Sequence, residues 1–591
     1  MSESHDSAPP PPAPPPAGVW ERLKEHKVMQ WTLAYAAAAY TLLHVVEMLS
    51  DAQDWPHAIV RLLSLLLIIG VPVVMTLAWY HGARAQRHVS GSELTIITLL
   101  LFIGGTALWA LSRNHGETAH GVGGAIAAAP RASELPSVAA GDKSIAVLPF
   151  ADMSEAKDQE YFADGMAEEI LDLLSRIPAL KVIARTSSFQ FKGQATDVRN
   201  VARLLGVATV LEGSVRKAGN RLRITTQLIR AADGSHLWSE SYDRNVDDVF
   251  RVQDEIAGAV VKRLELSLLD PATLGGSPTG NPEAHSLYLQ ARYLVNRDTL
   301  EDLNRAVQLY QQAIALDPKF AAAYAGLAYC HGRRIANGTN TAEAFATTRS
   351  AAEQAIALDP KLPDGYVMLA MARMQYDRDW SAAAQNIEKA RALDPNNVPM
   401  LHLAGHLISA TGSLAEAIGD FRSAIERDPL NPLLRRYLAR MLYYGGQYDE
   451  AAQLLRGVIA SDPGFPAAHY ELGRVLLATG DRQAAMAAFA AEPSVTWRYI
   501  GMPLGLHALK RAAEAGQALA TLVANSSGSE FQVAEAYAAF GDIDQAFHWL
   551  GRARDQHDPG VIVIRRDPLL RSLEHDPRYA TFLASVGLTP A

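Results

Sequence analysis

One short stretch of the sequence combines glycines with positive charge. Residues 211–229 read LEGSVRKAGNRLRITTQLI and hold four cationic side chains, at Arg216, Lys217, Arg221 and Arg223. Glycine beside cationic side chains is typical of phosphate-binding loops and of nucleic-acid-binding patches. The alternative is the turn of a β-hairpin, because Gly219 and Asn220 both tolerate positive φ.

Two histidines form a second candidate site. His402 and His406, in the stretch HLAGH, have the i,i+4 spacing that places two ligands on one helix face. The zinc-hydrolase motif needs a glutamate directly after the first histidine, and Leu403 stands there. With no third ligand evident, we expect no metal here and no cofactor in the chain. The single cysteine, Cys330, excludes a disulfide within one chain and a cysteine-based metal site.

The bulk composition bounds the function further. The chain has 591 residues, 49% hydrophobic and 20% charged, with a net charge of −9, which argues against a general nucleic-acid-binding surface. The motifs of a P-loop, a zinc hydrolase and a nucleophile elbow are missing from the sequence. We therefore expect neither an enzyme nor catalytic residues.

The first part of the chain reads as a membrane anchor. Residues 1–29 form a proline-rich tail that we expect to be disordered and cytoplasmic. A three-helix anchor is predicted over residues 30–111, because this part holds three apolar stretches, at 31–49, 58–80 and 94–111. Each is close to the roughly 20 residues that a helix needs to cross the hydrocarbon core.

The distribution of Lys and Arg predicts the orientation of this anchor. Cations precede the first stretch and lie between the second and third, whereas the loop SDAQDWPH between the first two has none. Cytoplasmic loops carry the excess of Lys and Arg. We therefore expect a bacterial inner-membrane protein with a cytoplasmic amino terminus and periplasmic soluble domains. Residues 112–142, rich in Gly, Ala, Ser and Pro, are predicted to be a flexible linker.

An α/β sandwich domain is predicted over residues 143–270. Apolar runs at 143–150 and 180–186 read as strands, and the stretches at 158–177 and 197–206 read as helices. Three further strands and a helix at 246–266 follow. Residues 221–231 alternate apolar and polar side chains, which is typical of a half-buried strand. In this arrangement RKAGN is the turn between two antiparallel strands, and its arginines form the outward half of the alternation.

The rest of the soluble part, residues 282–588, is predicted to be an all-α superhelix with a carboxy-terminal cap. Asp-Pro pairs end at Pro318, Pro360, Pro395, Pro429 and Pro463, and the later ones are 34 residues apart. That period is the spacing of tetratricopeptide repeats. Gly405 stands where two helices of a repeat touch, and 567–588 resembles the terminal cap of such proteins.

Resemblance to tetratricopeptide repeats also implies which residues face the concave groove. They are His402, His406, Arg436, Arg440, Tyr443, Tyr470 and Arg474. A basic and aromatic groove suits a protein or peptide partner, one with acidic groups or a free carboxylate. The alternative is that these are solvated side chains on an unused face.

Long stretches of the α/β domain resemble a known family. SIAVLPFADMS, EYFADGMAEEILDLLSRIPALKVIARTSSFQFKG and VARLLGVATVLEGSVRKAGNRLRITTQLIRAADGSHLWSESYDR are similar to the amino-terminal TolB-like domain, which is related to FlgO-type envelope domains. The family implies no established catalytic residues. Its members accompany tetratricopeptide repeats and also occur fused to class III adenylate cyclase, protein kinase or winged-helix domains.

The sequence therefore predicts a multidomain interaction scaffold of the bacterial envelope. Three transmembrane helices would carry a TolB-like α/β sandwich and a peptide-binding repeat groove, with membrane lipid around the spans and no nucleic acid as partner. The alternative is a regulatory or sensory subunit, related to the adenylate cyclase fusions but without a catalytic domain. A DNA-binding regulator is disfavoured because the predicted topology keeps the soluble part away from DNA.

Overall fold

The computed structural model describes residues 143–177, 179–194, 197–245, 248–264, 279–297, 299–336 and 341–589. The predicted tail, membrane spans and linker lie outside these residues and stay predictions. Within the described ranges, no helix is long and apolar enough to span a membrane. All the described residues belong to one compact unit, Ala132–Ala591.

A mixed sheet forms the centre of the α/β domain. Its strands are β1 (Ser144–Val147), β2 (Ala151–Asp152), β3 (Lys181–Val182), β4 (Thr209–Ala218), β5 (Arg221–Arg230) and β6 (His236–Asn245). The order is β3-β1-β4-β5-β6, with β2 also pairing with β4. β1 runs parallel to β3 and β4, whereas β4, β5 and β6 form an antiparallel meander.

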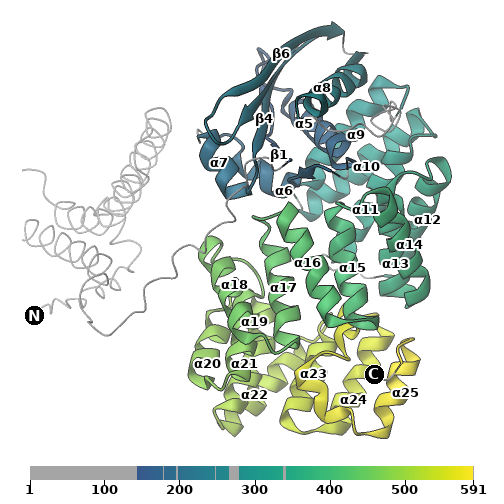
Figure 1. Ribbon diagram of the computed structural model, residues 1–591. Helices are drawn as coiled ribbons and strands as arrows, with labels where there is room; N and C mark the ends of the chain where they lie inside the picture. The colour runs from purple at the N-terminus through teal and green to yellow at the C-terminus, as the bar shows by residue number, and fades with distance from the viewer. Residues whose placement is uncertain are drawn as a thin grey trace, which may run out of the picture. The chain divides into compact units, whose positions relative to one another are not determined.

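Helices cover both faces of this sheet near β1 (Figure 1). They are α5 (Glu160–Ser175), α6 (Arg185–Ser188), η1 (Phe189–Phe191), α7 (Val198–Leu205) and α8 (Val249–Arg263). α5 and α8 pack on the face that carries Leu211 and Ile224, and α7 packs on the opposite face beside Val210. α7 ends at the carboxy-terminal cap Gly206, which has a φ of +64°, and this agrees with the predicted helix over residues 197–206.

The predicted strand at 180–186 is wrong beyond Val182. β3 ends there, and the chain turns into the short helix α6. The side chain of Arg185 pairs with Glu168 of α5, and the Ser187 hydroxyl donates a 2.5 Å hydrogen bond to Asp428 in the repeats. Glu168 and Asp428 are remote in the sequence from residues 183–188. The local apolar pattern, which predicted a strand, therefore could not indicate these contacts.

The glycine-containing cationic stretch is the predicted hairpin. Ala218 pairs with Arg221, which leaves a two-residue turn in which Gly219 has a φ of +58°. Arg216 lies directly opposite Arg223 across the two strands, and both are exposed. The alternation between a buried and an outward face is therefore confirmed.

Antiparallel helix pairs make up the rest of the unit. The pairs among the described residues are α9 (Pro282–Val295) with α10 (Leu300–Leu316), α11 (Ala321–Ala336) with α12 (Ala342–Leu358), α13 (Pro363–Ala372) with α14 (Trp380–Leu393), α15 (Val398–Thr411) with α16 (Leu414–Arg427), α17 (Pro432–Tyr444) with α18 (Tyr448–Ser461), α19 (Ala468–Ala478) with α20 (Arg482–Ala491), α21 (Val495–Ala508) with α22 (Ala512–Ala524), and α23 (Glu530–Phe540) with α24 (Ile543–Asp555). The π-helical turn η4 (Arg373–Asp377) follows α13, and η5 (Pro559–Val563), η6 (Pro568–Leu573) and α25 (Pro577–Ser585) follow α24.

The repeat signals explain this stacking. The aspartate of each Asp-Pro pair is the carboxy-terminal cap of its helix, and the proline after it cannot continue the helix. A Cβ at Gly405 would lie 2.6 Å from Phe421, so this position requires glycine for the close approach of α15 and α16. The helix α22 of the pair α21/α22 ends at Ala524 with Asn525 as its cap, so this pair lacks the Asp-Pro signal.

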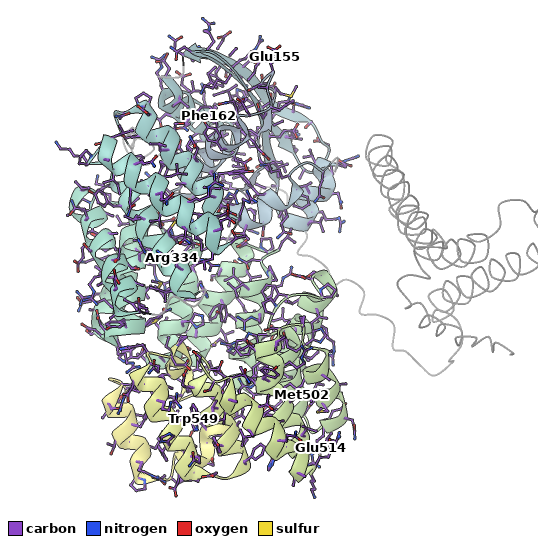
Figure 2. All side chains as sticks on the ribbon, turned by 180° about the vertical axis from the view of Figure 1, so that it is seen from behind. Glu155, Phe162, Arg334, Met502, Glu514 and Trp549 are labelled. Atoms are coloured by element: carbon purple, nitrogen blue, oxygen red, sulfur yellow. The ribbon has the colours of Figure 1, made fainter. Side chains whose placement is uncertain are left out.

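The α/β domain and the first repeats share one hydrophobic core. A single cluster of buried residues runs from Ile145 of β1 through Leu174 of α5 to Tyr310 of α10 and Cys330 of α11. In Figure 1, α9 and α10 lie beside α5, and Figure 2 shows Phe162 from behind where the sheet meets these helices. The sheet and the repeats therefore do not pack as two independent cores.

Gly165 on α5 gives a direct test of this packing. A Cβ at Gly165 would lie 2.7 Å from a methyl group of the buried Leu289 on α9, whereas a Cβ at Gly258 on α8 would meet nothing within 4 Å. Both changes to alanine gain helix propensity, so their difference isolates the steric cost. We expect Gly165→Ala to be less stable than Gly258→Ala by about 1–3 kcal/mol in chemical unfolding. Equal stabilities would contradict close α5–α9 packing.

Candidate functional site

The structure brings the seven predicted groove residues together on the first helices of three consecutive repeats. His402 and His406 lie on α15, with their Nε2 atoms 3.2 Å apart. Arg436 and Arg440 on α17 both bind the carboxylate of Glu471 on α19. Glu471 was not part of the prediction. One acid therefore holds two of the predicted arginines.

A second ion pair involves the end of the chain. Arg474 on α19 donates from Nη2 to both carboxylate oxygens of Asp567, at 2.7 and 2.6 Å. The Tyr444 hydroxyl donates to the same carboxylate at 3.3 Å, and Glu535 of α23 lies 3.7 Å from the Arg474 guanidinium. Asp567 is separated from Arg474 by 93 positions in the sequence.

The exposure of these residues differs from the prediction of an open groove. Arg436, Tyr443, Tyr470 and Arg474 are buried, whereas Arg440, His402 and His406 are partly exposed. The physical reasons differ from residue to residue. Arg474 is covered by Asp567 of the carboxy-terminal segment. Arg436 is paired with Glu471 of α19, and Tyr470 packs against Trp497 of α21. A role for the seven residues in partner binding stays a prediction, but four of them are closed to solvent in this conformation.

The covering segment contacts the face through polar and apolar groups. Arg566 donates from Nε to the carbonyl of Ser409 at 2.8 Å, and Arg565 donates to that of Ala410 at 3.2 Å. These carbonyls belong to the last turn of α15, where a helix leaves its acceptors unpaired. Val561 and Ile564 of the same segment are buried in the main core of the repeats. The cap therefore terminates the array and also fills its inner face.

Burial and neighbouring charges set the protonation of this face. Burial, together with Arg333 and Arg436, lowers the pKa of His402 to about 4. Burial also holds the pKa of His406 well below its usual range, and the nearby His402 and Arg440 add to this effect. Both rings are therefore neutral at pH 7. The predicted basic character of the groove comes from arginines alone.

The carboxylates behind this face are of two kinds. Burial raises the pKa of Asp567, but the charge of Arg474 and several hydrogen bonds outweigh it, and the net pKa lies below the ordinary value. Burial and the neighbouring Asp567 raise the pKa of Glu535 well above its usual range. Asp567 is therefore the anion that balances Arg474, and Glu535 keeps its proton.

The part of the face that stays partly exposed is aromatic. It consists of His402, His406, Tyr437 and Arg440, and we call it the aromatic patch. The ring of Tyr437 lies 5.0 Å from that of His402 and 4.6 Å from that of His406. The Arg436 guanidinium stacks 4.6 Å from the Tyr437 ring centroid. Because two arginines share the single carboxylate of Glu471, the patch keeps an excess of positive charge.

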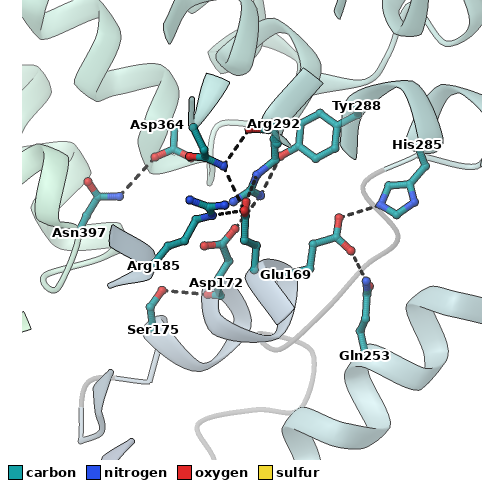
Figure 3. A network of polar contacts seen from close by, with 12 residues as sticks. Glu169, Asp172, Ser175, Arg185, Gln253, His285, Tyr288, Arg292, Asp364 and Asn397 are labelled. Atoms are coloured by element: carbon teal, nitrogen blue, oxygen red, sulfur yellow. Dashed lines mark hydrogen bonds and ion pairs between the residues drawn. The ribbon is translucent and has the colours of Figure 1, made fainter. Parts of the chain in front are cut away.

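A separate polar network joins α5 to α9 (Figure 3). Arg292 of α9 binds Glu168 and Asp172 of α5, each at 2.9 Å, and Arg185 also binds Glu168. Burial raises the pKa of Asp172 although Arg292 opposes this shift. The network holds the α/β domain on the first repeat.

The same helix pair carries a second carboxylate contact nearby. Nε2 of His285 lies 2.7 Å from the carboxylate of Glu169, and Gln253 of α8 donates to that carboxylate. Across the described ranges, no group of three or more His, Cys, Asp and Glu residues could hold a metal ion.

Comparisons with known families match three parts of the chain. Residues 141–259 match the family described as the HilA/YgeH-like transcriptional regulator, second domain. Residues 404–464 and 442–493 match two tetratricopeptide-repeat families. The chain therefore contains tetratricopeptide repeats, which are modules of protein–protein interaction.

One curated protein shows similarity over part of the chain. It is the "Putative adenylate cyclase 3" of Rhizobium meliloti (strain 1021), 42% identical over 206 residues. The match covers 33% of this chain and 35% of the relative. The match thus spans about a third of that protein's length.

Solved structures resemble parts of the chain at low identity and low structural similarity. A monomeric mutant of IFIT1 with Gppp-AAAA is 14% identical, with a TM-score of 0.35, and the match covers 52% of this chain and 76% of that one. PilW, a type IV pilus biogenesis factor, is 21% identical, with a TM-score of 0.30, and the match covers 36% of this chain and 96% of PilW.

The lowered histidine pKa predicts a pH dependence of stability. His402 has a pKa of about 4 in the folded chain against an ordinary 6.5, so the unfolded chain binds the proton more tightly. The stability that the neutral His402 ring gives the folded chain is fully present above pH 6.5. It is lost as the pH falls toward 4, because the unfolded chain takes up the proton first. Replacing His402→Gln should reduce the loss of unfolding free energy between about pH 7 and about pH 5 by roughly 2 kcal/mol.

The matched control is His548→Gln, because His548 is an exposed histidine on α24. It should keep the pH dependence of the wild type in urea titrations. If the two variants show the same pH dependence, the low pKa of the largely desolvated, partly exposed His402 ring is contradicted.

Proposed function

We propose that this protein is a non-catalytic interaction scaffold of the bacterial envelope. Three membrane spans would anchor it in the inner membrane, and its α/β domain and repeats would face the periplasm. Tetratricopeptide repeats bind proteins or peptides, which supports the class of function. The apolar stretches, the Lys and Arg distribution and the resemblance to TolB-like domains support the location.

The observation that carries the scaffold proposal is the core shared between the sheet and the first repeats. The cluster of buried residues is continuous from β1 to α11, and the ion pair between Arg292 and the buried Glu168 crosses the same boundary. This shared core fixes the position of the sheet relative to the first repeats. A partner bound to the repeats then has a defined position relative to the α/β domain.

The aromatic patch supports a protein or peptide partner with acidic groups. Tyr437 and the two neutral histidines offer rings for packing, and Arg440 offers a partly exposed guanidinium. Tyrosine and arginine are enriched at residues that dominate binding energy in interfaces. The four buried residues of the predicted groove would support this patch from below.

The second candidate is a regulatory or sensory subunit related to adenylate cyclase fusions. The 42% identity over 206 residues with a protein named as an adenylate cyclase favours it. That match covers 35% of the relative. The relative's name describes its whole length, so the match does not assign adenylate cyclase activity to this chain. A co-expression assay for cyclic AMP would separate this role from that of a scaffold.

Photo-crosslinking in cells tests the scaffold proposal. A photoreactive residue replaces Tyr437 in the full chain, and a control carries it at His548 on the exposed side of α24. We expect a discrete crosslinked protein from position 437 and none from position 548. Equal products from both positions would contradict a partner at the aromatic patch.

Reporter fusions in the same cells test the location. Fusions after residue 140 and after the last repeat should behave as periplasmic. Cytoplasmic behaviour would overturn the envelope assignment while leaving the crosslinking result valid.

A further inference from the structure

Strand β6 is a long, unpaired edge of the sheet. It has ten residues, His236–Asn245, and pairs with β5 on one side. No described residue forms a strand pairing or a backbone–backbone hydrogen bond with its other side. Figure 1 shows β6 at the outside of the sheet, away from β1. A strand edge presents a row of free N–H and C=O groups that can pair with another chain.

The pairing of β6 with β5 is regular from Trp238 to Asn245. The irregularity falls at Leu237, because Leu228 pairs with Trp238 and the next residue of β5, Ile229, pairs with His236. The regular part alternates between two faces. Ser239, Ser241 and Asp243 are exposed on one face, whereas the other face carries the buried Tyr242.

We propose that a second copy of this chain pairs with β6 in the antiparallel direction, about a twofold axis at Ser241. The two sheets would join into one across this axis. In this register Trp238 lies opposite Arg244 of the partner subunit, and Ser239 lies opposite Asp243 of the partner subunit. Glu240 lies opposite Tyr242 of the partner subunit.

Side-chain chemistry favours this register. An arginine beside tryptophan gives a cation–π contact, and serine can donate to aspartate. The Trp238 indole already lies beside a charged group, since it donates to Glu240 at 3.1 Å. In this register Glu240 faces the partner's Tyr242, Asp243 faces the partner's Ser239 and Arg244 faces the partner's Trp238. No two like charges lie directly opposite each other.

Neighbouring registers are less favourable. An axis at Glu240 or at Asp243 would place two like charges directly opposite each other, which is destabilising. An axis at Tyr242 would set two rings against each other that are each 5% exposed in the single chain. Directly opposite Cβ atoms are only about 4.5–5.5 Å apart, so small serine side chains suit the position on the axis.

Cysteine crosslinking of the full chain in detergent micelles tests the axis. The native Cys330 is buried, so an introduced cysteine is the accessible thiol among the described residues. Ser241→Cys should form a disulfide-linked dimer under mild oxidation, because the two thiols face each other. The matched control is Ser239→Cys, whose two copies would be four positions apart, or about 14 Å, and should stay monomeric on a non-reducing gel. Equal crosslinking of both variants, or none of Ser241→Cys, would overturn the proposal.

A charge variant gives an independent readout. Ser241→Lys places two lysines opposite each other on the axis, whereas Ser239→Lys faces Asp243 of the partner subunit. Light scattering should show a dimer fraction that falls at least tenfold for Ser241→Lys and holds for Ser239→Lys. Circular dichroism confirms that both variants are folded. A dimer fraction unaffected by either substitution contradicts pairing along β6.

Discussion

The packing of α5 against α9 is the constraint on which the rest of the structure depends. Arg292 is held between Glu168 and Asp172 at this contact, and glycine at position 165 lets the helices approach. The Glu168 carboxylate is the buried charge of this contact, and leaving a buried charge without its partner costs on the order of 3–5 kcal/mol. The contact therefore favours one arrangement of sheet and repeats over looser ones. A tetratricopeptide array joined by a flexible linker would have no such preference.

A similar closure operates at the other end of the array. The carboxy-terminal segment returns to α15 and α19, where Asp567 balances Arg474 and two arginines pair with the last carbonyls of α15. An open solenoid would leave these groups to solvent. In this chain most of the concave face of the repeats is buried. The surface that stays accessible to a partner is the smaller aromatic patch. The carboxylate of Asp567 thus occupies the place beside Arg474 where an acidic group of a partner could otherwise bind.

Local patterns in the sequence predicted much of this fold, and remote contacts account for the rest. Alternation found the β4–β5 hairpin, and Gly206 and the Asp-Pro pairs marked helix ends, because these signals act within a few residues. The helix α6 and the burial of Arg474 were missed, since Asp428 and Asp567 are their distant partners. Groove positions could be predicted, but their exposure depends on neighbours that the repeat pattern does not indicate, namely Glu471 for Arg436 and, for Arg474, a segment from the end of the chain. The membrane anchor lies outside the described residues and stays a prediction.

Native-state hydrogen exchange tests the central claim, that the sheet and the first repeats form one cooperative unit. Amides of β5 and of α10 should exchange with the same opening free energy in the full chain. Arg292→Gln should lower both by the same amount, because Arg292 joins the two parts. An α/β domain that opens at a lower free energy than α10, or that keeps its protection when Arg292 is replaced, would contradict the account.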